Sequence, residues 1–465
     1  MICEGKDMKM SNHKKTVCMT LSILLAAALM LSGCGGDAAS SGSNSEPASS
    51  SSTSSVDSKP DSSADSSSNS SASSTPDSSS QTSSSSESKP ENEGIRWKYQ
   101  IKGDGTAALI GFDENGKQPS GTVSIPEKTS DGKQVTSIGQ KVFYNNSQIT
   151  KVVLPGSIKI IDAQAFAECK KLKEVSLPES LESIGASAFY NTGLTSVVIP
   201  KNVKNIGMMA FYGCTELVSA HVECNAVFDG SPAKGIFTGC TKLQTVVLSD
   251  EITRIGDGMF AECRMLNNIN MPKKLTQIGN AAFSKCKSLP TPALPESLTD
   301  IGENAFAFCE SLEKITVPQN VKELKPYTFW HCSKLSEVKL PSNLEKIGAG
   351  AFAQCKTLPG ISIPAKVTEI GKSAFESCLS LQKIAVPERV TTIEQYTFAH
   401  CESLKKIYIP AKMSFIDVYA FESCRKMQVY YGGSDWSNIN YVLISGNSSI
   451  HNAEIICNSS AEAIL

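Results

Sequence analysis

Cysteine is the residue type in this chain with the widest chemical capacity, as a disulfide partner, a metal ligand or a nucleophile. The chain has 465 residues and 16 cysteines. Eleven of them occupy one position of a repeated phrase: Cys169, Cys214, Cys240, Cys263, Cys286, Cys309, Cys332, Cys355, Cys378, Cys401 and Cys424. Asn146 and Thr192 take this position in two further copies. Because these small polar residues share the position, we expect a side chain that hydrogen-bonds the backbone of a turn. The prediction is a column of buried thiols, and the alternatives are disulfides or a metal site.

The other residue types with catalytic or metal-binding capacity do not gather into a set. His331 and His400 share a position of the phrase but lie three copies apart, which is roughly 15 Å along a stack of strands. One metal ion cannot bind both, since its ligands must lie within about 2.1 Å of it. The segment from Gly185 to Phe189 resembles the start of a nucleophile elbow, yet it is one copy of the phrase. Because no P-loop, zinc motif or calcium loop occurs, we expect no metal, no cofactor and no enzyme activity.

The phrase itself predicts the architecture. It reads P-x-x-[LV]-x-x-I-G-x-x-A-F-x-x-C-x-x-L-x-x-[IV]-x-[LIV], and its phenylalanines recur about every 23 residues: Phe143, Phe166, Phe189, Phe211, Phe237, Phe260, Phe283, Phe306, Phe329, Phe352, Phe375, Phe398 and Phe421. A period of this length is typical of a solenoid. We predict a β-rich solenoid of the α/β type, a right-handed leucine-rich repeat superhelix of about 13 repeats of 23 residues. It would have a parallel sheet and a cap at each end.

Each part of the phrase predicts one element of a coil, the name used here for one turn of the solenoid. The run L-x-x-I-x-V alternates like a strand with its apolar residues inside. The proline that follows ends the strand, because proline cannot donate to a ladder. Isoleucine-glycine then turns the chain, and the A-F-x-x-C piece is predicted to form one helical turn or a 3₁₀ turn. The sequence therefore predicts one strand, one phenylalanine and one thiol per coil.

The start of the chain carries export and tethering signals. Lys14 and Lys15 precede an apolar run, and Leu31-Ser32-Gly33-Cys34 resembles a bacterial lipobox, where the signal is cut before a cysteine that is then lipidated. We predict a lipoprotein signal peptide at 1–33 and a membrane anchor through the lipid on Cys34. The alternative is an ordinary signal peptide with an incidental cysteine. Residues 34–94 are dominated by serine and predict a disordered linker.

Three further segments follow the linker. The sequence predicts an N-terminal cap at 95–135, the leucine-rich repeats at 136–428 and a C-terminal cap at 429–465. Strand-like pieces lie at 97–101 and 107–112 in the first cap. The net charge of −2 and the pI near 6.3 give no basic face for nucleic acid. We therefore expect an extracytoplasmic protein, anchored by lipid to the cell membrane and displayed at the bacterial cell surface, with no nucleic-acid partner.

Outward residues are the candidates for binding. On the predicted strands they form a small, mixed set without a charge stripe: Ser176, Val198, His221, Val247, Asn270, Ala293, Thr316, Lys339, Ser362, Ala385 and Tyr408. A mildly basic patch lies late in the array and comprises Lys314, Lys383 and Lys406. Aromatic residues near the A-F turn form another set: Tyr327, Trp330, His331, Tyr396 and Tyr419. Exposed aromatic residues are good contact anchors, and the alternatives are a solvated face and half-buried packing. The candidate ligand-binding residues are Tyr327, Trp330, His331, Tyr396, Tyr408, Lys383 and Lys406.

The 23-residue spacing has one long interruption. Phe211 and Phe237 are 26 positions apart, and the additional residues fall between Glu223 and Gly235. Insertions in solenoids map to loops on one face, which can be the binding face. A neutral insertion is the alternative. Cys224 and Cys457 lie outside the repeated position, so we expect them to be more readily oxidised than the other thiols.

The phrase I-G-x-x-A-F-x-x-C-x-x-L-x-x-I-x-[IV]-P resembles the BspA-like leucine-rich repeats, also called the Treponema type. The resemblance extends over 95–459 and includes a closing segment, Tyr430-Tyr431-Gly432-Gly433, that is similar to the cap of such arrays. It implies a bacterial or protist surface protein that mediates adhesion and recognition, without enzyme activity. The function it favours is binding of an extracellular protein of a host or neighbouring cell. The alternatives are a structural scaffold of the cell envelope and a module that binds glycan or peptidoglycan.

Overall fold

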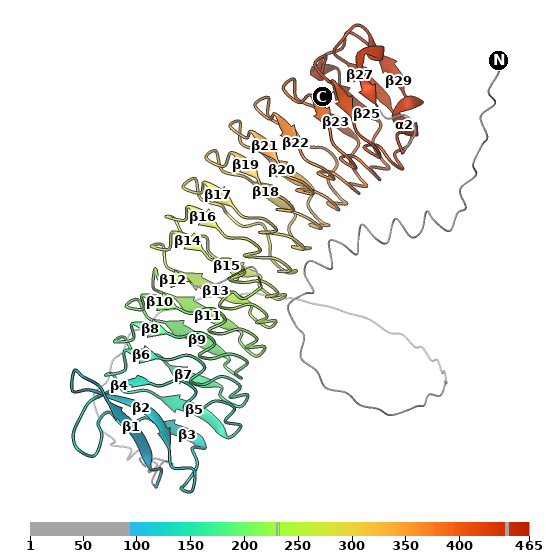
Figure 1. Cartoon of the computed structure of the whole chain (residues 1–465). Coiled ribbons are helices and arrows are strands. Elements are labelled where there is room, and N and C mark those ends of the chain that lie inside the picture. The colour runs from blue at the N-terminus through green and yellow to red at the C-terminus, as the bar shows by residue number, and fades with distance from the viewer. Residues whose placement is uncertain (1–93, 229–230, 232, 442–445, 465) are drawn as a thin grey trace, which may run out of the picture. The chain divides into compact units, whose positions relative to one another are not determined.

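The computed structural model describes residues 94–228, 231, 233–441 and 446–464. The predicted signal peptide at 1–33, the anchor residue Cys34 and the serine-rich linker up to residue 93 lie outside the described residues. From residue 94 onwards the chain forms coils that stack one beside the next (Figure 1). This is the predicted solenoid with a parallel sheet, and its repeats are about 23 residues apart.

Two antiparallel strands begin the array. β1 (Trp97–Ile101) pairs with β2 (Ala107–Phe112), and both strands occupy the predicted positions. β2 then pairs in parallel with β4 (Val135–Ile138), so the hairpin continues directly into the stacked coils. Trp97 and Phe112 lie with their ring centroids 6.2 and 6.1 Å from that of Phe143. The first cap therefore covers the end of the apolar interior.

Most coils contribute strands to two parallel ladders, where the sequence predicted only one. The first ladder is called here the sheet face: β3 (Gly121–Ser124), β5 (Ile149–Val153), β7 (Glu174–Ser176), β9 (Ser196–Ile199), β11 (Ser219–Val222), β13 (Thr245–Leu248), β15 (Asn268–Ile269), β18 (Lys314–Thr316), β20 (Glu337–Lys339), β23 (Lys383–Ala385), β25 (Lys406–Ile409), β27 (Gln428–Tyr431) and β29 (Glu454–Ile456). Proline follows most of these strands, as predicted.

The second ladder continues from β4 with two-residue strands, most of which end at the isoleucine before the glycine position. They are β6 (Ile160–Ile161), β8 (Ser183–Ile184), β10 (Asn205–Ile206), β12 (Val227–Phe228), β14 (Arg254–Ile255), β16 (Gln277–Ile278), β17 (Asp300–Ile301), β19 (Glu323–Leu324), β21 (Lys346–Ile347), β22 (Glu369–Ile370), β24 (Thr392–Ile393), β26 (Phe415–Ile416) and β28 (Asn440–Tyr441). Such short pieces were missed because two residues give no alternation to detect.

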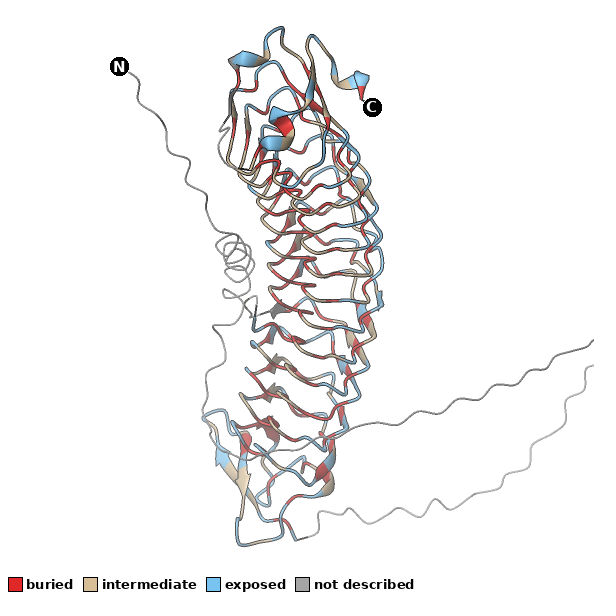
Figure 2. Cartoon of the chain, turned by 90° about the vertical axis from the view of Figure 1, so that its right-hand side faces the viewer, coloured by how far each residue is buried: buried red, intermediate tan, exposed pale blue. Residues whose placement is uncertain are grey.

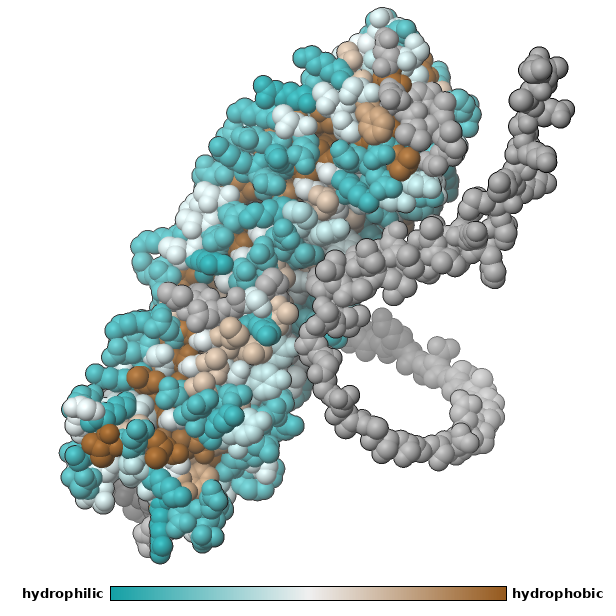
Figure 3. Space-filling model, in the orientation of Figure 1, coloured by the Kyte–Doolittle hydropathy of each residue, from teal (hydrophilic) through white to brown (hydrophobic). Residues whose placement is uncertain are grey.

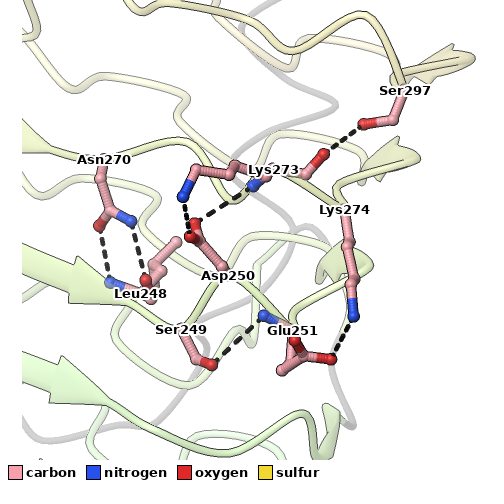
Figure 4. Close-up of polar contacts among 8 residues, drawn as sticks. All are labelled: Leu248, Ser249, Asp250, Glu251, Asn270, Lys273, Lys274 and Ser297. Carbon is pink, nitrogen blue, oxygen red and sulfur yellow. Dashed lines mark hydrogen bonds and ion pairs between the residues drawn. The ribbon is translucent and has the colours of Figure 1, made fainter.

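The sheet face is interrupted where proline enters the strand position. The coil between β15 and β18 contains Pro290 and Pro292, which cannot donate to a ladder. At β15 a side chain replaces the backbone pairing (Figure 4): Asn270 Oδ1 accepts from Leu248 N at 2.7 Å, and Asn270 Nδ2 donates to Leu248 O at 2.7 Å. The coils remain stacked across these breaks because the interior is continuous.

A column of phenylalanines fills that interior. The thirteen repeat phenylalanines are almost completely buried, and successive rings stack with centroids 5.1 to 5.8 Å apart. Leucine, isoleucine and valine from both ladders surround the column. Figure 2 shows the result, with buried residues along the inward side of every coil and exposed residues outside. Each coil therefore buries its apolar side chains chiefly against the coils before and after it.

The A-F-x-x-C piece is not helical, so the prediction of a helical or 3₁₀ turn is wrong. Ala165 N donates within the coil to Asp162 O at 3.2 Å, whereas Phe166 N donates to Ala188 O of the next coil at 2.8 Å. Two positions per coil, two residues before and two after the phenylalanine, adopt the left-handed region, as at Gln164 (φ 58°) and Glu168 (φ 64°). This alternation turns every second N–H towards the next coil, which a helix would not do.

Glycine at the position after the repeat isoleucine allows two neighbouring coils to approach each other closely. It is not needed for a left-handed backbone conformation. A Cβ on Gly185 would lie 2.4 Å from Ala163 N of the preceding coil, so a side chain there would force the two coils apart. The φ angle of Gly185 is not positive, in agreement with the presence of other residue types at this position in some coils.

The C-terminal cap replaces the missing next coil with side chains. Buried Asn447 accepts from Phe421 N at 3.1 Å and donates to Asp417 O at 2.8 Å. Trp436 packs edge-on against Tyr431 at 5.3 Å. The cap also contains three short helices: η1 (Trp436–Asn438), α2 (Ser448–His451) and η2 (Ala461–Ala463). Among the described residues no helix has the length and apolar character needed to cross a membrane.

Candidate functional site

The outward residues of the sheet face form a column in register. Val198 of β9 lies beside His221 of β11, which lies beside Val247 of β13. Neighbouring strands are about 4.8 Å apart, so adjacent side chains of the column lie within contact distance of one another. Most outward residues predicted from the sequence are exposed: Ser176, Val198, Val247, Asn270, Ala293, Thr316, Lys339 and Ser362, with His221 and Ala385 partly so.

The N-terminal half of this column is apolar. Val153, Val198 and Val247, called here the valine row, keep 40%, 51% and 45% of their surface exposed. Ser176 and His221 lie between them, and His221 Nδ1 is 3.5 Å from Glu223 Oε1. Single exposed valines are common on proteins, but three on one face at intervals of two coils form a patch. The sequence reasoning left out Val153, although its spacing from Phe143 matches that of Ser176 from Phe166.

The C-terminal half of the same face is charged and internally paired. Lys314 of β18 binds Glu337 of β20 at 3.0 Å, and Lys339 lies 3.4 Å from the other oxygen of that carboxylate. Both lysines lower the pKa of Glu337, Lys314 more strongly. In the view of Figure 3 apolar patches lie over the first strands of the array, while hydrophilic residues predominate over most of the remaining surface. The two halves therefore present different chemistry on one scaffold.

Tyr408 does not belong to this surface, and its prediction as an outward residue is wrong. It is only 3% exposed, because the C-terminal cap covers the last coils. Its hydroxyl donates to the carboxylate of Glu388, and a Cβ on Gly432 would lie 2.7 Å from that hydroxyl. Burial, together with Glu388, raises the pKa of Tyr408. The tyrosine therefore contributes to the packing of the cap.

The basic patch is smaller than the sequence suggested. Lys383 of β23 and Lys406 of β25 are neighbours in register, as predicted. Lys383 is exposed, whereas half-buried Lys406 places its Nζ 5.6 Å from the ring centroid of Tyr430. The positive charge of Lys406 is thus held against an aromatic ring of the next coil.

The aromatic candidates separate into two groups. Trp330 and His331 pack with Phe308 of the preceding coil, and Tyr327 packs with Trp330. The closest ring centroids, those of Phe308 and Trp330, are 4.6 Å apart. His331 also hydrogen-bonds Gln354 of the next coil at 3.0 Å.

The second group lies three coils further on. Tyr396 stacks on Tyr419 at 5.2 Å, and Lys372 Nζ lies 5.7 Å from the Tyr396 ring. All the aromatic candidates near the A-F turn are half-buried, which agrees with the alternative of packing between coils.

The repeated cysteines form the predicted buried column. Ten are fully buried and Cys424 is half-buried. Each thiol donates to the carbonyl of the phenylalanine one coil earlier, as Cys309 Sγ does to Phe283 O at 3.3 Å and Cys378 Sγ to Phe352 O at 3.2 Å. Asn146 performs an equivalent task, since its Nδ2 donates to Pro119 O at 3.1 Å. The thiols are therefore structural donors that satisfy carbonyls in the interior.

Burial also sets the reactivity of the thiols. It raises the pKa of Cys169 and Cys378 to about 12, which leaves them protonated near neutral pH. Cys224, which we expect to be more readily oxidised than the repeated thiols, is buried as they are, and burial raises its pKa. Cys457 is half-buried. Among the described residues no group of three or more histidine, cysteine, aspartate or glutamate side chains is arranged to hold a metal ion.

Comparison with known proteins gives a consistent picture. The family model "BspA type Leucine rich repeat region" matches residues 132–227, 233–336 and 322–451, which together make up more than half of the chain. A leucine-rich repeat protein from Bacteroides ovatus has 27% sequence identity and a TM-score of 0.50, over 73% of this chain and 98% of that one. A leucine rich cell surface protein from Faecalibacterium prausnitzii has 26% identity and a TM-score of 0.45, over 79% and 94%. No curated protein sequence matches the chain.

Proposed function

The chain belongs to the BspA type leucine-rich repeat family, and we propose that it is a cell-surface recognition protein that binds an extracellular protein of a host or neighbouring cell. Leucine-rich repeat solenoids generally mediate protein interactions, and proteins of this family are found at the cell surface. Within the chain, the valine row on the sheet face between β5 and β13 is the proposed contact. The observation that carries this proposal is the exposure of Val198 and Val247. Their strands, β9 and β13, pair with the two edges of β11, which carries His221.

The chemistry of the valine row favours a protein partner. A protein interface places apolar side chains at its centre and polar groups at its rim. The valines could supply such a centre, and Lys151 with Glu174, an ion pair of 2.5 Å on the neighbouring outward position, could lie at the rim. Removing the exposed valine surface from water would contribute about 25 cal/mol per Å² to binding.

The anchor of this protein is proposed to be the lipid on Cys34. The support is the sequence Leu31-Ser32-Gly33-Cys34 after a basic segment and an apolar run. Wild-type chain expressed in a bacterium should take up radioactive palmitate and sediment with membranes. Cys34→Ala should abolish the label and release the chain, whereas Cys18→Ala, within the apolar run, should leave both unchanged. Equal labelling of Cys34→Ala would refute the anchor.

Binding can be tested with the full chain against a panel of immobilised matrix proteins, mucin and peptidoglycan. The double variant Val198→Asp/Val247→Asp places two carboxylates on the proposed contact. Thr316→Asp, at the same outward position of β18, is the matched control. We expect saturable binding to a protein of the panel that weakens at least tenfold in the double variant and is unchanged in the control. Retention of peptidoglycan alone would favour a glycan-binding module, and no binding at all would favour an envelope scaffold.

A further inference from the structure

The corner between the two ladders carries a regular ridge of turns. In most coils the proline position is followed by a two-residue turn, and the turns of successive coils stack into this ridge. Side chains link them across coils (Figure 4): Lys273 Nζ lies 2.6 Å from Asp250 Oδ2, and Lys274 Nζ lies 2.6 Å from Glu251 Oε2. Ser297 Oγ then donates to Lys273 O at 2.9 Å. Between these two coils the charged groups of the ridge pair with one another.

One coil lacks its turn. Five residues, 200–204, connect β9 to β10, and five residues, 249–253, connect β13 to β14. Only four residues, 223–226, connect β11 to β12. The additional residues of the 26-residue repeat follow β12 in the sequence. The ridge therefore has a notch that is one coil wide, about 5 Å at the spacing of stacked strands.

An open hollow of about 660 Å³ occupies the N-terminal side of this notch. Most of the residues that line it are polar or charged, among them Glu179, Glu182, Lys201, Asn202, Lys204 and Asn225. Glu182 is engaged, since Lys204 Nζ lies 2.7 Å and Lys159 Nζ 3.8 Å from its oxygens.

Two charged groups at the hollow remain available. Glu179 and Lys201 hold the same position in neighbouring coils as Asp250 and Lys273. In the described part of the chain, however, no hydrogen bond or ion pair engages the Lys201 ammonium or the Glu179 carboxylate. The notch therefore combines an open hollow with one unpaired cation and one unpaired anion.

We propose that this notch is a binding site for an anionic saccharide, a sugar chain that carries carboxylate or sulfate groups. Lys201 would bind the anionic group through a charge-assisted hydrogen bond. The Asn225 amide can both donate to and accept from ring hydroxyls, and Glu179 can accept from them. The hollow is within the range of ligand sites, about 300 to 1,000 Å³.

The composition of the lining favours a sugar over a peptide. Peptide and protein contacts rely on aromatic or apolar anchors in pockets. The one apolar lining residue, Val203, is buried at 2% exposure, and no aromatic side chain lines the hollow. A hydroxyl-rich ligand needs hydrogen-bond donors and acceptors instead, and the side chains that line the notch supply both. None of the residues that line the hollow belongs to the valine row, so the saccharide site can be tested independently of the proposed protein contact.

The test uses the full chain and oligosaccharides of equal length, measured by calorimetry or by ligand-observed NMR. The probes are a tetrasaccharide with glucuronate, a sulfated tetrasaccharide, a neutral tetramer of N-acetylglucosamine and a tetraglutamate peptide. We expect saturable binding of at least one anionic tetrasaccharide and at least tenfold weaker binding of the neutral sugar and the peptide. Whichever anionic probe binds more tightly identifies the natural group as carboxylate or sulfate.

Two variants locate the site. Lys201→Glu should weaken binding at least tenfold, and so should Asn225→Trp, which fills the hollow with a bulky ring. Lys412→Glu changes an exposed lysine on the same ridge near the C-terminal end and is the matched control. The proposal is overturned if no anionic sugar binds, if the peptide binds as well as the sugar, or if Lys412→Glu weakens binding as much as Lys201→Glu. Circular dichroism of each variant verifies that the solenoid is intact.

Discussion

The inward and outward sides of the sheet face are made by the same strands, yet they follow different rules. On β9, Val197 is 3% exposed and its neighbour Val198 is 51% exposed. Inward positions hold apolar residues in nearly every coil, because each must fill the same space between two neighbours. Outward positions range from valine through histidine to lysine. Repetition therefore marks what stacking requires, and variation marks what is available for recognition.

The largest expected effect comes from the inward thiols at high pH. An unfolded chain loses thiol protons from about pH 9, whereas buried Cys169 and Cys378 keep theirs until about pH 12. The unfolded state thus holds fewer protons in this window, so stability is complete below pH 9 and falls as pH rises towards 12. Each thiol in a cooperative unit contributes about 1.4 kcal/mol per pH unit. Thermal melts followed by circular dichroism at pH 7 to 11 should show a steep loss above pH 9.

A matched variant isolates the thiols from other groups that titrate at high pH. Threonine occupies the cysteine position naturally at Thr192. Burial raises the pKa of both thiols, so Cys286→Thr/Cys309→Thr should reduce the alkaline loss of stability by about 3 kcal/mol per pH unit if both coils unfold together. An unchanged slope would show that the thiols do not carry the effect.

The next largest effect is expected for the phenylalanine column. Phe283 stacks between Phe260 and Phe306 at 5.6 and 5.3 Å, without exposure to solvent. Phe283→Ala should cost about 3–5 kcal/mol, because it leaves a cavity that the adjoining coils cannot close. Tyr144→Ala removes an aromatic ring that is 49% exposed beside Phe143, and it should change stability by less than about 0.5 kcal/mol. Urea unfolding gives both values, and equal costs would contradict the comparison.

Asn270 is an outward residue that nevertheless stabilises the fold, so it is an exception to the difference between inward and outward positions. Its side chain makes two hydrogen bonds of 2.7 Å to the backbone of Leu248 (Figure 4). Asn270→Ala leaves that N–H and C=O without these partners and should cost about 1–2 kcal/mol. The nearby exposed Asn267 is the control, because in the described part of the chain its side chain makes no hydrogen bond to the backbone. Hydrogen exchange of the Leu248 amide should accelerate in Asn270→Ala and stay unchanged in Asn267→Ala.

The inward positions could be predicted well from the sequence, because the same residue types recur at them in successive coils. The positions of the phenylalanine column, the thiol column and the first two strands follow from period and alternation alone. The turn around each phenylalanine was mistaken for a helix, because its left-handed positions hold ordinary residues such as Tyr327 and His331 rather than glycine. Their conformation depends on hydrogen bonds to the next coil, and a single repeat gives no sign of those bonds.

The exposure of the outward residues was less predictable from the sequence, since it depends on which other segments of the chain cover the strand. Tyr408 has the spacing of an outward residue, but the C-terminal cap covers it, and nothing in its own repeat indicates this. The missing turn at 223–226 was visible only as part of a longer interruption. The spacing showed three additional residues in that repeat, whereas the structure separates one shortened turn from a longer segment after β12.

The smallest effect on stability is expected at the valine row, where an outward valine and an inward valine are adjacent on one strand. Val198→Thr keeps the branched shape that suits a strand and replaces one methyl group with a hydroxyl, at a position that is half open to solvent. It should change the free energy of unfolding by less than about 0.5 kcal/mol, measured by urea titration. Val197→Thr on the same strand buries the hydroxyl among apolar side chains and should cost about 1–3 kcal/mol. If both substitutions cost the same, the outward side of β9 is not free of the constraints of stacking, and its valine cannot be assigned to recognition.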